Sequence, residues 1–391
     1  MPASTFHIAI IGAGPGGLVC ARVLQRHGVP VTVYERDLGP VGSVPDGPLE
    51  LRAATGRAAL RAAGLEQEFR ALAHPAGLEA RLLDHTGAVL HCEAPEPGTT
   101  QERPEIARRA LRRLLVDSLA PGTVRWGRYL RTLHPRGGGR HQAVFDDGET
   151  ATFDLVIGAD GSWSRVRPGL SDATPHYSGV TFVETGLDDV DARHPDAAQL
   201  VGRGTMMALS GGKGLIARRD AHGRVRVYAA FRGAEDWART AGVRTTDTEA
   251  VRSALLAAFD GWHDRLRALL GDSDDGFVNR PLFALPVPHT WPHALGLTLL
   301  GDAAHLMTPL SGPGADLALQ DGCELARHLV EAHTWQTDPD HAVRAYEADL
   351  FPRSAAAAQT AAADLDAALA PDAPRPTHRL FRRRHLHPHG S

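Results

Sequence analysis

The chain has 391 residues, of which 43% are hydrophobic and 23% are charged, and this composition is typical of a globular enzyme with two domains or lobes. Its formal net charge of −4 gives no reason to expect nucleic acid or an anionic membrane surface as a partner. Its 3 cysteines lie far apart and none belongs to a Cys-x-x-Cys pair, so neither a disulfide framework nor a zinc site is expected.

A glycine-rich loop follows the first predicted strand, the apolar run at residues 8–11. In this loop Gly12 would make the turn, Gly14 would let the backbone approach a pyrophosphate, and Gly17 would let the next helix pack on the sheet. That helix is predicted over residues 15–27, beginning at Pro15. Its first turn would present free N–H groups and a positive dipole end to the phosphates.

The second predicted strand, residues 31–34, ends at Glu35, where a carboxylate can accept hydrogen bonds from ribose hydroxyls. Strand, loop, helix, strand and acid therefore occur in the order of a dinucleotide site. A plain glycine-rich turn would account for the loop alone but not for the whole series.

The next predicted elements are helices over residues 54–63 and 65–73, separated at Gly64, and a helix over residues 106–119. Short strands are expected between residues 124 and 157, with turns at 137–139 and 146–148.

A second motif follows the apolar strand that ends near residue 157. This strand delivers Asp160 and Gly161 to a loop, and Ser164 and Arg167 are spaced to pin the next turn. An Asp-Gly pair alone usually marks a tight turn. The buried strand before it and the two polar residues after it favour a functional interpretation.

Residues 177–232 are rich in predicted strands and form a second sheet inserted between the motifs. Its apolar side chains, about half of which must be ordinary core because strand residues alternate faces, are candidates for a substrate wall: Phe182, Met206, Met207, Leu215, Tyr228 and Phe231. A capping-box pattern at Thr246 predicts a helix that runs to about residue 259.

A third motif, Gly301-Asp302, follows the predicted strand at residues 297–300. Asp302 could accept a hydrogen bond from a ribityl hydroxyl. Beyond Pro309, a helix is predicted from Gly314 to about residue 331. If the dinucleotide is FAD, the N–H groups of this helix would point at the edge of the flavin ring where negative charge collects on reduction. Another helix is expected from about residue 341 through the alanine-rich stretch 355–370, and a solvated basic tail follows.

Together the three motifs resemble the class A FAD-dependent monooxygenases, the aromatic hydroxylase family, and are most similar to the tetracycline-inactivating flavin monooxygenases. The resemblance covers nearly the whole chain and is strongest at residues 301–307, with further support at 47–51, 103–108 and 157–167. It implies an α/β fold: a Rossmann-like FAD-binding domain of the GR2 type, an inserted mixed β-sheet substrate domain and a long C-terminal helix.

The expected boundaries follow from this resemblance. The FAD-binding domain would comprise residues 1–75, 105–175 and 286–335, and the substrate domain residues 76–104 and 176–285. The C-terminal helix would occupy residues 336–375 and a flexible tail residues 376–391.

The resemblance also assigns cofactor contacts. The pyrophosphate would be held by the first loop, the adenosine end by the acid and arginine after the second strand, and the ribityl chain and isoalloxazine by later segments. The residues concerned are Gly12, Gly14, Pro15, Gly17, Glu35, Arg36, Glu50, Arg108, Asp160, Asp302, Pro309, Gly312, Gly314 and Ala315.

Two departures from the family pattern matter. The usual Gly-Gln-Gly-x-Asn is replaced by residues 312–316, in which the carboxylate of Asp316 would oppose negative charge on the flavin unless it points away. A nicotinamide-contacting arginine of the family falls near Ser43, which leaves the hydride-donor site open.

In the tetracycline-inactivating enzymes, polar side chains bind the polar edge of the drug. The corresponding positions of this chain fall near Thr185, Thr205 and Arg226, which do not match those side chains, so tetracycline is not the favoured substrate. With Met207 and Tyr228, these residues are the substrate candidates.

The resemblance implies an enzyme that uses FAD, NADPH or NADH, and O₂. A flavin C4a-hydroperoxide would hydroxylate or epoxidise an aromatic or polycyclic small molecule in natural-product tailoring or antibiotic modification. No catalytic side chain or metal is required, and His305 is expected to be a structural part of its loop rather than a base. A flavin reductase or halogenase, or a non-catalytic flavin- or metabolite-binding protein, remains an alternative.

A cytoplasmic monomer that binds neither membrane nor nucleic acid is expected. No apolar run is long enough to span a bilayer, and the chain enters a strand at once without a leader.

Overall fold

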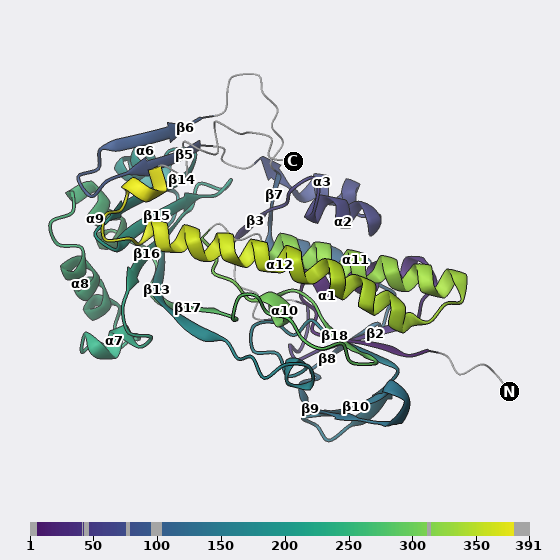
Figure 1. Cartoon of the computed structure of the whole chain (residues 1–391). Coiled ribbons are helices and arrows are strands. Elements are labelled where there is room, and N and C mark those ends of the chain that lie inside the picture. Colours follow the sequence, from purple (N-terminus) through teal and green to yellow (C-terminus); the bar gives the residue numbers. More distant parts are fainter. Residues whose placement is uncertain are drawn as a thin grey trace. The chain divides into compact units, whose positions relative to one another are not determined.

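The computed structural model describes residues 6–40, 42, 47–75, 79–94, 104–310 and 314–378 (Figure 1). The chain divides into two compact units. Unit 1 comprises Met1–His74, Pro104–His176 and Ala284–Ala361, and unit 2 comprises Pro75–Arg103, Tyr177–Phe283 and Ala362–Ser391. The last boundary between the two units falls within the long C-terminal helix α12 (Pro339–Ala368), after Ala361.

Unit 1 is built on a five-stranded parallel sheet with the order β18-β12-β1-β2-β8. These strands are Leu297–Leu299, Leu155–Gly158, Ile8–Ile11, Val31–Glu35 and Val124–Trp126, respectively. The central strands β1 and β12 are buried along their whole length, as expected of parallel strands covered on both faces. The sheet and its helices confirm the predicted Rossmann-like architecture.

Two helices of unit 1 cross closely beside this sheet. Helix α1 (Pro15–Arg26) packs against α11 (Gly314–Trp335) through glycine. A Cβ atom added to Gly16 would lie 2.5 Å from the Ala318 carbonyl oxygen, and one added to Gly322 would lie 2.1 Å from the Gly16 carbonyl oxygen. The two backbones therefore approach more closely than any larger residue would allow.

The remaining helices of unit 1 are α2 (Gly56–Ala62), α3 (Glu66–Leu72), α4 (Arg108–Asp117) and the single turn α10 (Asp302–His305). The predicted break at Gly64 is present. The predicted helix over 106–119 begins two residues later than expected, because Ile106 belongs to strand β7.

Two small sheets complete unit 1, with the orders β3-β7-β4 and β11-β10-β9. Their strands are Pro48–Glu50, Pro104–Ala107, His74–Pro75, Thr150–Phe153, His141–Phe145 and Leu130–Pro135.

Unit 2 contains a seven-stranded mixed sheet with the order β17-β13-β16-β15-β14-β5-β6. These strands are Val278–Ala284, His176–Leu187, Val225–Arg232, Lys213–Arg219, Gly204–Ser210, Glu79–Leu83 and Val89–Glu93. Strand β14 pairs parallel with β5 and antiparallel with β15. Strands β5 and β6, which flank the connection at residues 84–88, were not predicted from the sequence.

One face of this sheet is covered by helices, namely α5 (Val190–Arg193), α6 (Pro195–Val201), α7 (Trp237–Thr240), α8 (Thr248–Ala258) and α9 (Asp264–Gly271). The capping-box prediction was wrong by one residue. Asp247, not Thr246, is the N-cap of α8, and its carboxylate accepts a hydrogen bond from the Ala250 N–H. Among the described residues, no helix has both the length and the apolar character needed to cross a membrane.

Candidate functional site

The three predicted motifs emerge from adjacent strands at the carboxyl edge of the unit 1 sheet. Strand β1 pairs in parallel with both β12 and β2, placing Ile11 opposite Gly158 and Tyr34, and Gly158 lies opposite Leu299 of β18. All four strands therefore end at nearly the same level. Parallel open sheets bind ligands in the crevice outside these strand ends.

The two glycines of the first loop have different roles. Gly12 has a φ of +109°, and a Cβ atom there would lie 2.3 Å from the carbonyl oxygen of Ala159, so this position is required by the packing of the chain itself. The nearest atom to a Cβ atom on Gly14 is 3.9 Å away. A Cβ atom on Gly14 would thus make only an ordinary van der Waals contact with the protein, and no side chain caps the first turn of α1 beside it. This arrangement suits close approach by a phosphate.

Glu35 fastens the end of β2 to the glycine-rich loop. One of its carboxylate oxygens accepts a hydrogen bond from the Ala13 N–H at 2.6 Å, and the other accepts one from the Asp37 N–H at 2.9 Å. Each carboxylate oxygen has a second lone pair, so a ribose hydroxyl can still be bound.

Arg112 of α4 is a residue of this site that the sequence interpretation missed. Its guanidinium pairs with Asp37 at 2.7 Å and lies 3.6 Å from Glu35, and its side chain is only 5% exposed. It also lies over the ring of Trp126, 5.4 Å from the centroid. The signal available in the sequence was its place on the buried side of an amphipathic helix, one turn after Arg108.

The second motif holds a buried acceptor with unused capacity. The Oδ2 atom of Asp160 accepts the Arg165 N–H at 2.7 Å. Its Oδ1 atom is buried and has no hydrogen-bond partner among the described residues. Burial raises the pKa of Asp160, against hydrogen bonds from Ser164 and from backbone N–H groups. Because an orphaned buried oxygen is costly, this atom is available to accept a hydrogen bond from a ligand or a water molecule.

Arg167 connects the second motif to the third. Its guanidinium donates to the carbonyl oxygens of Ser162 at 2.8 Å, Ala173 at 3.1 Å and Ala303 at 3.1 Å. Ser164 accepts the Arg167 N–H at 3.0 Å, so the predicted pinning of this turn is present.

Asp302 begins the third motif at the first position of α10. Burial raises the pKa of its carboxyl group, while the charges of His305 and Arg108 and a hydrogen bond from Ser162 act in the opposite direction. Two more predicted residues lie in the first turn of α11, where Gly314 and Ala315 are half-buried. A Cβ atom on Gly314 would lie 3.9 Å from Asp302 Oδ1.

Asp316 is turned toward the segment before α2. Its Oδ1 atom accepts the Gly56 N–H at 2.9 Å and the Arg52 N–H at 3.2 Å, and its Oδ2 atom accepts the Thr55 hydroxyl. With three donors and 4% exposure, this carboxylate is committed to the protein. The sequence predicted that this carboxylate would oppose negative charge on the flavin unless it pointed away. Its side chain is turned to the segment before α2.

The other predicted cofactor residues lie at various depths. Arg36 and Glu50 are exposed at the ends of β2 and β3, Arg108 is half-buried at the start of α4, and Pro309 is exposed. Gly312, like Ser43, lies outside the described residues.

The substrate candidates of unit 2 do not share one face of its sheet. Thr185 lies opposite Val227, whose side chain belongs to the helix-covered core. Tyr228 lies on the other face, in line with Ile216 and Met207 on the neighbouring strands.

Thr205 and Arg226 both lie opposite Arg218, on this second face. Arg226 forms an ion pair with Glu184. The predicted half-and-half division of the apolar candidates is also present. Met206 and Leu215 belong to the helix-covered core and Phe231 packs against it, whereas Phe182, Met207 and Tyr228 lie on the other face.

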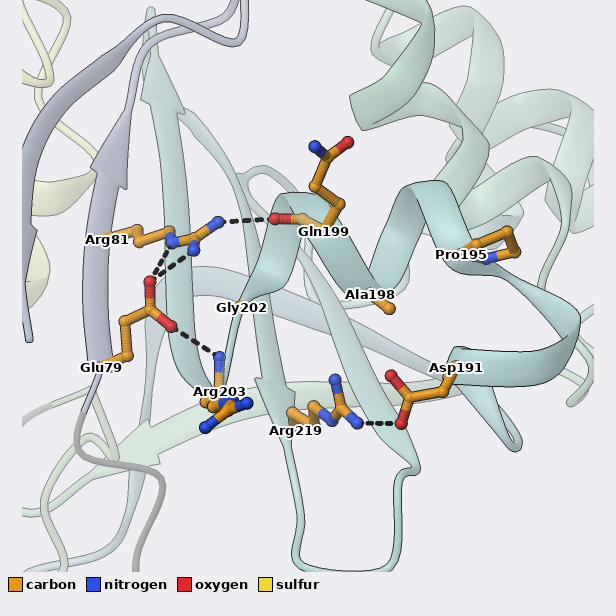
Figure 2. A pocket seen from close by; sticks show the side chains of 9 residues that line it. All are labelled: Glu79, Arg81, Asp191, Pro195, Ala198, Gln199, Gly202, Arg203 and Arg219. Atoms are coloured by element: carbon orange, nitrogen blue, oxygen red, sulfur yellow. Dashed lines mark hydrogen bonds and ion pairs between the residues drawn. The ribbon is translucent and has the colours of Figure 1, made fainter.

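Unit 2 also contains an arginine-lined depression of about 420 Å³, at the end of the sheet where α6 meets β14 (Figure 2). Arg81 is held there by Glu79 and by the Gln199 carbonyl oxygen at 2.6 Å, and Arg219 pairs with Asp191. Arg203 forms no ion pair with the residues drawn in Figure 2. Two of the three guanidinium groups are thus already neutralised, and we assign no ligand to this depression.

The unit 1 site fits a flavin dinucleotide on three observations. Gly14 leaves space above an uncapped helix N-terminus, Asp160 retains an unpaired buried oxygen, and Asp302 lies at the third strand end. These groups offer N–H donors to phosphates and carboxylate acceptors to hydroxyls.

Comparison with known proteins is consistent with this geometry. Residues 5–260 and 293–361 match the model of a family described as FAD binding domain. The chain is 32% identical over 380 residues to the monooxygenase asqM of Emericella nidulans, covering 84% of this chain and 85% of asqM. It is also 32% identical over 406 residues to the monooxygenase penA of Penicillium thymicola, covering 90% and 92%.

Solved structures share the fold at lower identity. The Klebsiella pneumoniae protein HpxO, crystallised with FAD and uric acid, superposes with a TM-score of 0.79 at 21% identity, covering 97% of this chain and 92% of HpxO. The tetracycline destructase Tet(55) superposes with a TM-score of 0.72 at 20% identity, covering 98% and 95%.

Proposed function

Because the chain belongs to the class A FAD-dependent monooxygenase family, we propose that it uses NADPH or NADH and O₂ to hydroxylate or epoxidise an aromatic or polycyclic small molecule. The observation that carries this proposal is the convergence of three glycine- and acid-bearing segments on adjacent parallel strand ends, where Asp160 Oδ1 has no partner among the described residues. The proposed role is natural-product tailoring or antibiotic modification, a role favoured by the fold shared with a tetracycline destructase.

Bound FAD would supply the redox chemistry that couples oxidation of the nicotinamide to transfer of one oxygen atom from O₂. The chain's own residues would bind and orient it. Gly14 and the first turn of α1 would hold the pyrophosphate, and Glu35 the adenosine ribose. Asp302 and Arg108 would hold the ribityl chain, whose hydroxyls match their acceptor and donor groups.

The first turn of α11 would favour negative charge on a bound ligand through its N–H groups and dipole, by about 0.3–1 kcal/mol. Asp316 would oppose this effect only weakly, because its carboxylate is turned to the segment before α2, where three donors stabilise its charge. The reason for considering a non-catalytic flavin-binding protein is thereby weakened.

The face of the unit 2 sheet opposite its helices would bind the organic substrate. Phe182 and Tyr228 form an aromatic pair there, with ring centroids 5.7 Å apart, and Met207 extends the apolar surface. Arg226, whose charge is balanced by Glu184, would orient polar substituents beside this surface through its N–H groups.

The direct test is to purify the protein, record its flavin spectrum, and screen aromatic and polycyclic compounds for stimulated NAD(P)H oxidation. The expected product gains the mass of one oxygen atom, and labelled ¹⁸O₂ should deliver the label. If ligand-stimulated NAD(P)H oxidation yields only reduced or halogenated product, the reductase or halogenase alternative holds. If no ligand stimulates oxidation of a flavin-loaded protein, the proposed reaction is wrong.

A further inference from the structure

A group of charged side chains is buried behind the third motif. His305 is 3% exposed, and its Nε2 atom lies 2.6 Å from Oδ2 of Asp321, whose side chain is fully buried. The same oxygen accepts the Gly301 N–H at 3.0 Å. Asp321 therefore holds both the first residue of the Gly301–Asp302 turn and the imidazole that follows it.

Two further charges come from neighbouring helices. Arg353 of α12 lies 3.0 Å from Asp321 Oδ1 and 2.5 Å from Glu324 of α11. Asp321 and Glu324 contribute two negative charges, whereas Arg353 contributes one positive charge. The charges of these four side chains balance only when His305 is an imidazolium, and Asp321, the fully buried member, is the one for which an uncompensated charge would be costly.

The second ring nitrogen of His305 gives independent evidence. The Nδ1 atom is buried and has no hydrogen-bond partner among the described residues. His305 lines a small cavity of about 10 Å³ together with Leu306 and Ser354. This volume is close to the minimum for one water molecule. A water there would accept from Nδ1–H and donate to the Ser354 hydroxyl oxygen, which itself donates to the Phe351 carbonyl oxygen at 3.2 Å.

We propose that His305 is a resident imidazolium, with one buried water on Nδ1, and that it acts as a positioning residue which fixes the Gly301–Asp302 turn and stabilises the anionic form of Asp302. This inference rests on the proposed flavin site only through Asp302. The charge state of His305 can be tested without assuming that this site binds flavin.

The two carboxylates that face His305, Asp321 and Asp302, both raise its pKa. Burial alone lowers the pKa of His305, but the charge and hydrogen bond of Asp321 and the charge of Asp302 raise it above its usual value. Burial raises the pKa of Asp321, and His305, Arg353 and the Gly301 N–H lower it to a net value below the usual range.

His289, on the other side of the cavity, has its pKa lowered by burial, and both of its ring nitrogens have neutral partners, the Ala304 carbonyl and the Ser171 hydroxyl. It therefore adds no competing positive charge near neutral pH.

The sign of the pH dependence follows from these directions. The ion pair stabilises the fold fully below the pKa of about 6.5 of an unfolded histidine, and this contribution is lost as pH rises through the raised folded-state pKa of His305. The Asp321 contribution is present above the pKa of an unfolded aspartate and is lost as pH falls through its lowered value.

The first experiment uses the flavin-loaded protein labelled with ¹⁵N-histidine. The chain has 21 histidines, and the His305 resonances are identified as those missing from His305→Gln. At pH 8, where exposed histidines are neutral, the His305 nitrogens should show imidazolium shifts. A neutral imidazole at pH 8, or titration near pH 6.5, overturns the proposal.

The second experiment measures FAD dissociation from the holoprotein by recovery of flavin fluorescence on dilution, between pH 5 and 9. An ionised Asp302 accepts from the ribityl chain, so affinity falls as pH decreases through its pKa. In His305→Gln the midpoint of this fall should move upward by about 1–3 pH units, because a nearby positive charge has been removed. Asp321→Asn is instead followed through the His305 nitrogen shifts, because it lowers the pKa of His305 but also removes a charge that raises the pKa of Asp302.

His333→Gln is the matched control, since His333 is exposed near the end of α11 and outside the cluster. An equal loss of affinity at every pH in His305→Gln would mean a purely structural role and would overturn the link to Asp302. If the protein oxygenates no substrate but both His305 experiments give the expected results, the proposed reaction is wrong and the inference about His305 stands.

Discussion

The proposed flavin-binding segments of unit 1 and the face of the unit 2 sheet opposite its helices are organised by different physical rules. In unit 1 the functional groups lie on turns directly after buried strands, where backbone geometry demands glycine and backbone N–H groups hold the acids. In unit 2 they lie along strands, where only the alternation of faces decides which side chain is available. The first kind of site leaves a motif in the sequence, and the second does not.

The largest effects should come from the glycine-rich loop and should separate its two roles. Gly14→Val is expected to give folded but colourless protein, because its side chain fits the protein without overlap but enters the space proposed for a phosphate. Gly12→Val is expected to give little folded protein, since its Cβ atom would overlap the Ala159 carbonyl. Flavin absorbance per mole of protein and thermal melting by circular dichroism measure the two outcomes. A yellow Gly14→Val protein would refute the assignment of the pyrophosphate to this loop.

Asp302→Ala should also be colourless, which tests the third motif as Gly14→Val tests the first. If both variants retained full flavin absorbance, the whole set of cofactor residues would be misplaced.

The next largest effect is expected at Arg112. Arg112→Met would leave the carboxylates of Asp37 and Glu35 without their buried cation, which destabilises proteins by roughly 3–5 kcal/mol. FAD affinity should fall as well, because Glu35 holds the loop through the Ala13 N–H. Urea unfolding and flavin titration measure these changes. Arg109→Met, exposed on the same helix, is the control, and equal behaviour of the two variants would argue against this role.

Asp316→Ala should affect stability rather than colour. It removes the acceptor for the Gly56 and Arg52 N–H groups and the Thr55 hydroxyl, at a cost of roughly 1–3 kcal/mol for each donor left buried and unpaired. The flavin reduction potential should hardly change, because the carboxylate is already paired within the protein. A potential that rises strongly in Asp316→Ala would show instead that this charge acts on the flavin.

The sequence was sufficient for those features that depend on local geometry. The parallel strands, the glycine-rich loop, Asp160 and Asp302 follow from residues close together in the chain. The direction of Asp316 and the burial of Arg112 depend on partners 260 and 75 residues away, so no local pattern contains them. The His305–Asp321 pair joins a short turn to a separate helix, and the sequence suggested only that His305 was structural.

The face of Thr185 was also beyond the sequence, because a shift of one residue in strand register exchanges the two faces. The alignment to tetracycline-binding positions placed Thr185 beside Thr205 and Arg226, but its side chain belongs with Val227 in the helix-covered core.

The smallest effects should therefore distinguish the two faces of the unit 2 sheet. For compounds that stimulate NAD(P)H oxidation by the wild type, Tyr228→Leu should raise KM about 2- to 13-fold, the equivalent of the roughly 0.5–1.5 kcal/mol that a contact between its ring and an aromatic substrate would contribute. Thr185→Val should leave KM unchanged and alter only stability, since its hydroxyl donates to the Asp275 carbonyl oxygen at 3.3 Å within the packed face. Flavin content serves as the control for both variants. A KM change in Thr185→Val as large as that in Tyr228→Leu would mean that substrate recognition does not depend on the face opposite the helices, and the proposed substrate surface of unit 2 would be wrong.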